Sequence, residues 1–353
     1  MHANPILRSR PLAISMGEPA GVGPDIILAA HQALLNQGKS GLGGLVFGDV
    51  ATFRERANAL ALPVDVIVAE PEEFDTQTAS LQVVQAGQGL KTSPGKPAWD
   101  GVPGVLAALD AACSAVSKGV CSALVTAPIH KAHLYGAGFA FPGHTEFLED
   151  FARTRSGAPS AKAVMMLAGP ELKTVPVTVH QSLRAAISHL SVERIVQVGR
   201  IVHTDLQGRF ALESPKLVFC GLNPHAGEDG TLGDEDARII APAIDQLVRA
   251  GVNAEGPFPA DTLFHADARS NYDVAVCMYH DQALIPVKTL DFHNSVNVTL
   301  GLPFIRTSPD HGTALPLAGT GTASPASMLA AINMAHSMVA QDAAHSSTNA
   351  RSA

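Results

Sequence analysis

Histidines follow several apolar, strand-like runs of this chain, at or just after the point where each run ends. Near neutral pH a histidine presents an imidazole nitrogen that can bind a divalent cation or carry a proton. One such histidine is more often structural than functional. Three on neighbouring parallel strands would meet at one edge of a sheet, where they would suit Zn²⁺ or Co²⁺. A metal-free histidine cluster stabilised by carboxylates is the alternative. The histidines that follow a strand most directly are His180, His225 and His280.

A second group of polar residues lies in and just before the run VNVTLGLPFIRTSPDHGTA, which is rich in Gly, Pro and Thr. Lysine and arginine in such a stretch can hold a phosphate or a carboxylate, and arginine can do so with two parallel hydrogen bonds. An ordinary pair of surface cations fits the pattern equally well. The residues concerned are Lys288, Asn297 and Arg306.

Two loops are candidates for holding a cofactor. Residues His311, Gly312, Thr313 and Ala314 precede a helical stretch, and their small side chains would admit the flat adenine of a nucleotide. A helix-capping loop is the alternative. The Gly-rich turn at 17–25 also leads into a helix, but it lacks the GxGxxG spacing of a dinucleotide fingerprint.

The elements that must position these residues alternate along the chain. Short runs rich in β-branched residues are separated by amphipathic stretches near 24–36, 102–117 and 192–206. This alternation predicts an α/β fold with mostly parallel strands covered by helices on both faces. In open α/β sheets, function gathers at the carboxyl ends of the strands, so the residues after each strand carry the functional prediction.

Composition restricts the class of protein further. The chain has 353 residues, a formal net charge of −8 and no apolar run long enough for a membrane span, so neither nucleic acid nor a membrane is an expected partner. The four cysteines are widely spaced and form no CxxC motif, which indicates buried thiols in a reducing compartment. The first residues fit a short tail better than an export signal, so a cytoplasmic location is expected.

Several motifs together resemble one family. GEPAGVGPD, TAPIHK, PGHTEF, GLNPHAGEDG, GPFPADTLF, MYHDQ and VNVTLGLPFIRTSPDHGTA are similar to those of the 4-hydroxythreonine-4-phosphate dehydrogenase (PdxA) family, in register from about residue 10 to 340. The resemblance implies two lobes like those of the isocitrate and isopropylmalate dehydrogenases, in a homodimer with the active site near the subunit interface. We expect lobe 1 to comprise 1–125 and 285–353, lobe 2 to comprise 126–284, and residues 342–353 to form a disordered tail.

The resemblance also implies roles for individual residues. It implies one divalent metal ion per subunit, Zn²⁺ or alternatively Mg²⁺ or Co²⁺, and NAD or NADP bound by the 311–314 loop. Asp261, which otherwise reads as a helix cap, joins Asp281 and Lys131 as a candidate proton carrier. The implied metal ligands are His180, His225 and His280. The implied contacts to a small phosphorylated substrate are His144, Thr145, Lys288, Asn297 and Arg306.

The implied reaction is metal-dependent oxidation of 4-phosphooxy-L-threonine to a β-keto acid, which then decarboxylates, in pyridoxine 5′-phosphate biosynthesis. Dehydrogenases of 4-phospho-D-threonate or D-erythronate are the nearest alternative. Dehydrogenases of a terephthalate cis-dihydrodiol are less favoured, because their substrate has no phosphate for the predicted contacts to bind. More distant alternatives are acyl transfer of the phosphotransacetylase kind and a catalytically silent metabolite-binding protein.

Overall fold

The computed structural model describes residues 10–87, 93–136, 139–141 and 143–352. The chain divides into two compact units, with Met1–Gly157 and Pro303–His336 in unit 1 and Ala158–Leu302 and Ser337–Ala353 in unit 2. The first two changes of unit come later in the chain than the lobe boundaries expected from the sequence, and a third assigns 337–353, expected in lobe 1, to unit 2. Among the described residues, no helix combines the length and the apolar character needed to cross a bilayer.

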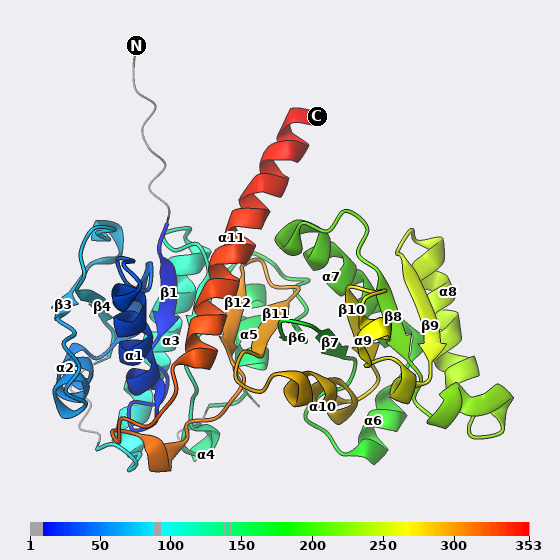
Figure 1. Cartoon of the computed structure of the whole chain (residues 1–353), viewed down its shortest axis with the longest axis horizontal. Coiled ribbons are helices and arrows are strands. Elements are labelled where there is room, and N and C mark those ends of the chain that lie inside the picture. Colours follow the sequence, from blue (N-terminus) through cyan, green and yellow to red (C-terminus); the bar gives the residue numbers. More distant parts are fainter. Residues whose placement is uncertain (1–9, 88–92, 137–138, 142, 353) are drawn as a thin grey trace. The chain divides into compact units, whose positions relative to one another are not determined.

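Unit 1 is a parallel α/β unit with six strands (Figure 1). Its elements are β1 (Leu12–Ser15), α1 (Gly23–Asn36), β2 (Gly44–Gly48), α2 (Val50–Ala59), β3 (Val66–Val68), η1 (Pro71–Glu73), β4 (Leu81–Gln85), η2 (Trp99–Gly101), α3 (Val102–Ser117), β5 (Leu124–Thr126), α4 (Lys131–Gly136), α5 (His144–Arg155), β12 (Arg306–Pro309), η6 (Leu315–Leu317) and the first part of α11 (Ala326–Ser352).

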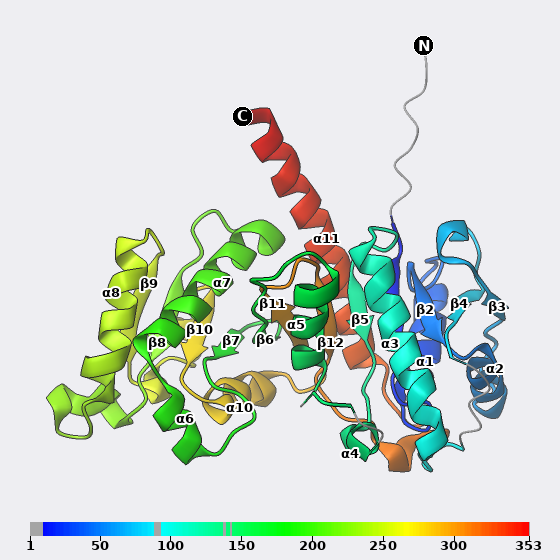
Figure 2. The same cartoon turned by 180° about the vertical axis from the view of Figure 1, so that it is seen from behind.

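The strands of unit 1 lie in the order β3-β4-β2-β1-β5-β12, and every pairing among them is parallel. Helices cover both faces, with α1 on the side seen in Figure 1 and α3 on the side seen in Figure 2. Local sequence sets the helix starts, because Pro24 stands in the first turn of α1 and Asp49 caps α2 by accepting a hydrogen bond from Thr52 N at 2.9 Å.

Unit 2 holds six more strands. Its elements are β6 (Val164–Ala168), β7 (Lys173–Pro176), α6 (Leu183–His189), α7 (Val192–Phe210), β8 (Leu217–Cys220), η3 (Pro224–Gly230), η4 (Asp236–Ile240), α8 (Ala241–Arg249), β9 (Ala254–Phe258), η5 (Ala260–Thr262), α9 (Ala266–Arg269), β10 (Val274–Cys277), α10 (His280–Leu290), β11 (Val296–Leu300) and the rest of α11.

The strands of unit 2 lie in the order β11-β6-β7-β10-β8-β9. β7, β10, β8 and β9 are mutually parallel, whereas β6 is antiparallel to both β7 and β11. A core that includes Leu167, Cys220, Cys277 and Val287 packs α10 against β6, β7, β8 and β10. This core fixes the strands whose carboxyl ends carry the candidate histidines.

The structure confirms the α/β class with mostly parallel strands. The unit boundaries differ from the expected lobes because α4 and α5 pack with α3 in unit 1, while α10 and β11 pack in unit 2. The helix α11 takes in residues 342–352, for which the sequence predicts a disordered tail. Residues 1–9 of the expected N-terminal tail lie outside the described residues.

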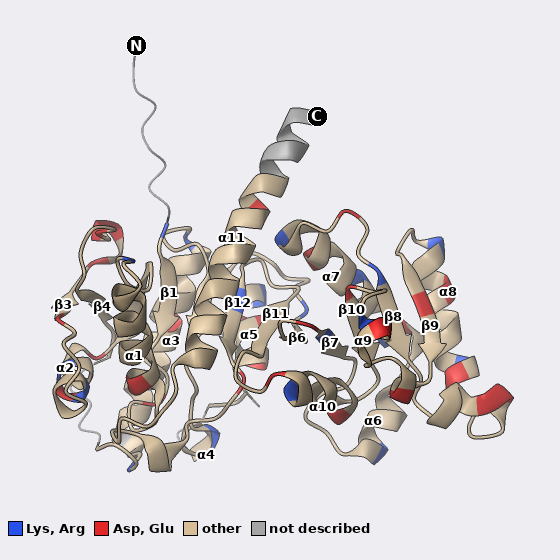
Figure 3. Ribbon diagram, in the orientation of Figure 1, with Lys and Arg blue, Asp and Glu red and all other residues tan. Residues whose placement is uncertain are grey.

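Basic residues are spread over many elements of both units rather than gathered on one (Figure 3).

Candidate functional site

In unit 2, three neighbouring parallel strands deliver the three candidate metal ligands to one edge. β10 pairs with β7 on one side and β8 on the other, so their carboxyl ends lie together. His180 lies four residues beyond the end of β7, and His280, the first residue of α10, lies three residues beyond the end of β10. The rings of His180 and His280 lie near each other, with centroids 5.8 Å apart and planes tilted by 42°. Strand pairing thus brings two of the three predicted imidazoles together.

The ring of His280 is oriented by the residue that follows it. His280 Nδ1 donates a hydrogen bond to Asp281 Oδ1 at 2.7 Å, and the side chain of His280 is 34% exposed. A carboxylate on one ring nitrogen fixes the tautomer and leaves Nε2 available to a ligand. Asp281 thus contacts a predicted metal ligand, and its role as a proton carrier stays a prediction.

His225 lies in a turn of unusual backbone conformation. Residues 225–229 all have positive φ, between 41° and 85°, and only Gly227 among them is a glycine. The turn is braced by the buried Asp236, whose carboxylate accepts hydrogen bonds from Leu222 N at 2.8 Å and Asn223 N at 3.1 Å. His225 is exposed at this turn. Asp261 is exposed in η5, just beyond β9.

Within the residues that the structure describes, no three His, Cys, Asp or Glu side chains gather closely enough to hold a metal ion. The rings of His180 and His280 lie near each other within one chain, but among the described residues no third such side chain joins them in a metal-binding group. The donor type and the shared sheet edge suit a divalent cation, but the set of three stays a prediction.

Unit 2 also carries two of the predicted substrate contacts. Lys288, on α10, places its Nζ 5.3 Å from the centroid of the Phe292 ring. Asn297 lies on β11 opposite Leu167 of β6, and its Oδ1 is buried without a hydrogen-bond partner. A buried amide oxygen of this kind is usually satisfied by water or by a ligand.

In unit 1, Arg306 and His144 form the polar centre of the predicted substrate contacts. Arg306 begins β12, is 3% exposed and donates from Nη2 to Thr126 Oγ1 at 2.6 Å. Burial lowers the pKa of Arg306 to about 10, with Cys113 and Asp310 acting in the opposite direction, so it stays a cation at neutral pH. Thr145 follows His144 in the first turn of α5.

His144 is held in its neutral form. Its Nε2 is buried and has no hydrogen-bond partner among the described residues. Burial lowers the pKa of His144 well below its ordinary value, and the charges of Arg306 and Lys131 act in the same direction. A neutral imidazole beside a buried guanidinium can accept or donate one hydrogen bond without adding a charge.

Replacing His144 by Gln is expected to change how stability depends on pH. The unfolded chain binds a proton at this residue near pH 6.5, whereas the folded ring resists it. The contribution of His144 to the free energy of unfolding is therefore complete above about pH 6.5. Below that value the free energy of unfolding decreases, by up to roughly 1.4 kcal/mol per pH unit. Urea unfolding between pH 5 and 7.5 should give a flatter acid limb for the variant. The exposed His189→Gln is the control, and a pH-independent offset for His144→Gln would contradict the argument.

The predicted cofactor loop packs on the Gly-rich turn of unit 1. Val22 N donates to Thr313 O at 2.9 Å, and a Cβ at Gly21 would lie 2.9 Å from the same oxygen. His311 is held by Ser327 Oγ at 2.8 Å from its Nε2, which ties the loop to the start of α11. Gly312 has open space on its Cβ side. The 311–314 loop is thus fixed at both ends and open in the middle.

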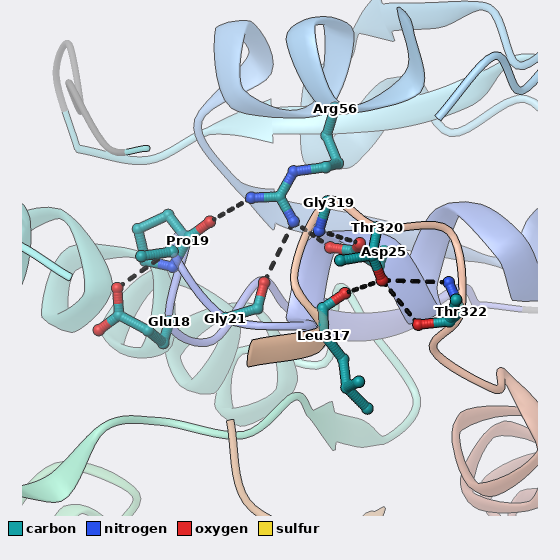
Figure 4. A network of polar contacts seen from close by, with 10 residues as sticks. Glu18, Pro19, Gly21, Asp25, Arg56, Leu317, Gly319, Thr320 and Thr322 are labelled. Atoms are coloured by element: carbon teal, nitrogen blue, oxygen red, sulfur yellow. Dashed lines mark hydrogen bonds and ion pairs between the residues drawn. The ribbon is translucent and has the colours of Figure 1, made fainter. Parts of the chain in front are cut away.

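A buried ion pair behind this loop was not evident from the sequence. Asp25 and Arg56 pair with side chains that are each 3% exposed, and Arg56 also donates to Pro19 O at 2.9 Å and Gly21 O at 3.2 Å. Asp25 Oδ1 accepts from Gly319 N at 2.7 Å. Figure 4 shows how this network joins α1, α2, the 17–23 turn and the 317–322 loop. The only feature of the sequence that pointed to this ion pair was an acidic residue, Asp25, in the first turn of α1.

Two α/β units with polar residues at the carboxyl ends of parallel strands define an enzyme of the open-sheet α/β class. The family model for the pyridoxal phosphate biosynthetic protein PdxA matches residues 43–335. The chain belongs to the PdxA family.

Individual relatives agree with this assignment. The chain is 49% identical over 334 residues to a 4-hydroxythreonine-4-phosphate dehydrogenase of Xanthobacter autotrophicus, covering 94% of this chain and 95% of the relative. The crystal structure of the Klebsiella pneumoniae protein of the same name matches with a TM-score of 0.83 and 35% identity, over 94% of this chain and 100% of that one. A terephthalate 1,2-cis-dihydrodiol dehydrogenase from Burkholderia xenovorans matches with a TM-score of 0.62 and 26% identity, over 93% and 98%.

Proposed function

We propose that this chain oxidises 4-phosphooxy-L-threonine with NAD⁺ or NADP⁺. The secondary hydroxyl would lose its proton to a base and the hydride on the same carbon would pass to the nicotinamide, giving 2-amino-3-oxo-4-phosphooxybutanoate. Loss of CO₂ from this β-keto acid would give 3-amino-2-oxopropyl phosphate, a step toward pyridoxine 5′-phosphate. The observation that carries the proposal is the 49% identity, over nearly the whole chain, to a relative named for this activity.

The buried cation of unit 1 supports a phosphorylated substrate. Arg306 is held by Thr126 and stays charged, so it can give a phosphate two parallel hydrogen bonds without first losing a shell of water. His144, neutral beside it, would bind the phosphate or a hydroxyl through Nε2, and Thr145 would add a hydroxyl donor. In unit 2, Lys288 and Asn297 are the further proposed contacts to the substrate.

His180, His225 and His280 are the proposed ligands of a divalent ion, Zn²⁺ or alternatively Mg²⁺ or Co²⁺. When bound, such an ion lowers the pKa of the substrate hydroxyl and stabilises the alkoxide. Asp281 would keep Nε2 of His280 directed away from its own carboxylate. Asp261, Asp281 and Lys131 are the proposed proton carriers.

A homodimer is also part of the proposal. The helices that follow β7 and β10 expose large apolar side chains, with Leu183 62% exposed, Ile187 45% and Ile285 62%. Apolar surface of this kind commonly marks a protein interface. A second copy near α6 and α10 could supply the imidazole that one chain does not bring to the His180–His280 pair.

Steady-state kinetics with a panel of substrates tests the function. We expect kcat/KM for 4-phosphooxy-L-threonine to exceed those for 4-phospho-D-threonate and D-erythronate by at least about tenfold, since the amine replaced by hydroxyl leaves its partner unsatisfied. NADH formation at 340 nm is the readout, with NAD⁺ and NADP⁺ compared. Faster turnover of either phosphosugar acid would replace the proposed substrate with that acid.

A further inference from the structure

The single tryptophan of the chain has an exposed ring at the edge where the predicted cofactor loop lies. Trp99 begins η2 and is 57% exposed, although tryptophan is usually largely buried. One face of its ring stacks on His133, with centroids 4.7 Å apart and an interplanar angle of 28°. His130 packs edge-on against His133 at 4.5 Å. The indole is therefore held in place by a histidine pair while much of its surface remains open.

The loop that leads to Trp99 is joined to both loops of the cofactor side. Gly95 N donates to Ala20 O at 2.8 Å, in the Gly-rich turn. On the other side, a Cβ at Gly95 would lie 3.2 Å from Leu315 O, and one at Gly319 would lie 2.8 Å from Pro94 Cβ. Contacts this close to backbone fix residues 93–95 between the 17–23 turn and the 315–319 segment. Trp99 follows four residues later.

The other neighbours of Trp99 belong to the reactive end of the site. His133 shares α4 with Lys131, a proposed proton carrier. Lys131 lies against Gly143, where an added Cβ would be 3.5 Å from Nζ, and its charge also acts on His144. The stacking surface is thus beside the groups proposed to contact the substrate.

A buried carboxylate lies close to the two histidines that hold the ring. Glu18 is 5% exposed, accepts a hydrogen bond from Ala20 N at 3.1 Å, and lies within electrostatic range of His130 and His133. Burial raises the pKa of this carboxyl, and the two histidines lower it. Indole is the aromatic face that attracts cations best. The oxidised nicotinamide ring is a flat cation, whereas adenine is flat and neutral.

We propose that Trp99 is the stacking surface for the nicotinamide ring of the dinucleotide, backed by His133. This inference rests on the proposed dehydrogenase function and adds the position of the reactive half of the cofactor. The 311–314 loop would then hold the adenine half. Gly136 is part of the same arrangement, because a Cβ at that position would overlap the indole ring.

The fluorescence of the single tryptophan tests the proposal directly on the full-length protein. We expect NAD⁺ and nicotinamide mononucleotide to quench it, NADH to accept energy from it, and ADP-ribose to bind with little quenching. Trp99→Leu should raise KM for NAD⁺ roughly three- to tenfold, the range expected for a lost stacking and cation–π contact. Trp99→Phe should recover most of that loss. Gly136→Ala should imitate Trp99→Leu, because it displaces the ring without changing it.

Two outcomes would overturn the inference. One is quenching by ADP-ribose as strong as that by NAD⁺ with none from the mononucleotide, since the ring would then stack adenine. The other is an unchanged KM for NAD⁺ in Trp99→Leu, or no response of the tryptophan to any of these probes. Quenching by NADH without NAD⁺ reduction on any phosphorylated substrate would reject the proposed function but leave the binding site supported. Circular dichroism and thermal unfolding verify that each variant is folded.

Discussion

Replacing His225 by Asn is expected to abolish turnover while leaving the fold intact. Asparagine tolerates the left-handed conformation that His225 adopts at φ 52°, so the turn should survive and only the imidazole is lost. If His225 binds the divalent ion, kcat/KM should fall on the order of 10³-fold and the metal content should fall with it. Metal content by mass spectrometry and NADH formation at 340 nm are the two measurements.

A matched control separates metal binding from the loss of any exposed histidine. His293 is exposed in the same unit, in the loop between α10 and β11, and His293→Asn should keep both metal and rate. Full metal content in His225→Asn together with an unchanged rate would remove His225 from the ligand set. Loss of rate with metal retained would point instead to a proton-transfer or substrate-contact role.

Replacing Asp25 by Ala is expected to destabilise unit 1 by about 3–5 kcal/mol, because it leaves the buried guanidinium of Arg56 without its carboxylate. Gly319 N would lose its acceptor at the same time. The free energy of unfolding, from urea titration followed by circular dichroism, is the measurement.

The double variant Asp25→Leu with Arg56→Met tests the cause. Removing both charges leaves no buried guanidinium without a carboxylate partner. Most of the free energy of unfolding lost in Asp25→Ala should therefore return. A single variant within about 1 kcal/mol of the parent would mean that Pro19 O and Gly21 O satisfy Arg56 on their own. An equally large loss in the double variant would show that packing, rather than charge, sets the cost.

Periodicity and strand patterning sufficed for the α/β class and for most of the long elements. The stretch 102–117 is the helix α3, and the stretch 192–206 lies in the helix α7. Four strands, β4, β9, β11 and β12, were missed. Three of them, β9, β11 and β12, include Pro, Asn or Arg and carry little period-two signal. His180 was expected directly after a strand, but β7 ends at Pro176 and His180 lies in a bend four residues later.

For the site, the sequence indicated which residues share an edge but not how close they come. The strand order places the ends of β7, β10 and β8 side by side. The short distance between the His180 and His280 rings follows from this order. The backbone conformation of His225 belongs to a run of positive φ angles that the residue types do not predict. The Asp25–Arg56 pair was likewise beyond reach, because its partners come from different helices and pair only after packing.

The turn at 225–229 has a consequence for how this segment can vary in sequence. Each non-glycine residue held in the left-handed region costs roughly 1–2 kcal/mol, and β-branched residues are the least tolerant of it. Four such residues, His225, Ala226, Glu228 and Asp229, surround a single glycine. Valine, isoleucine and proline are therefore excluded there by backbone geometry alone. Glu228 and Asp229 need no chemical role to be retained, because substitution at their positions is limited to the few residue types that this conformation admits.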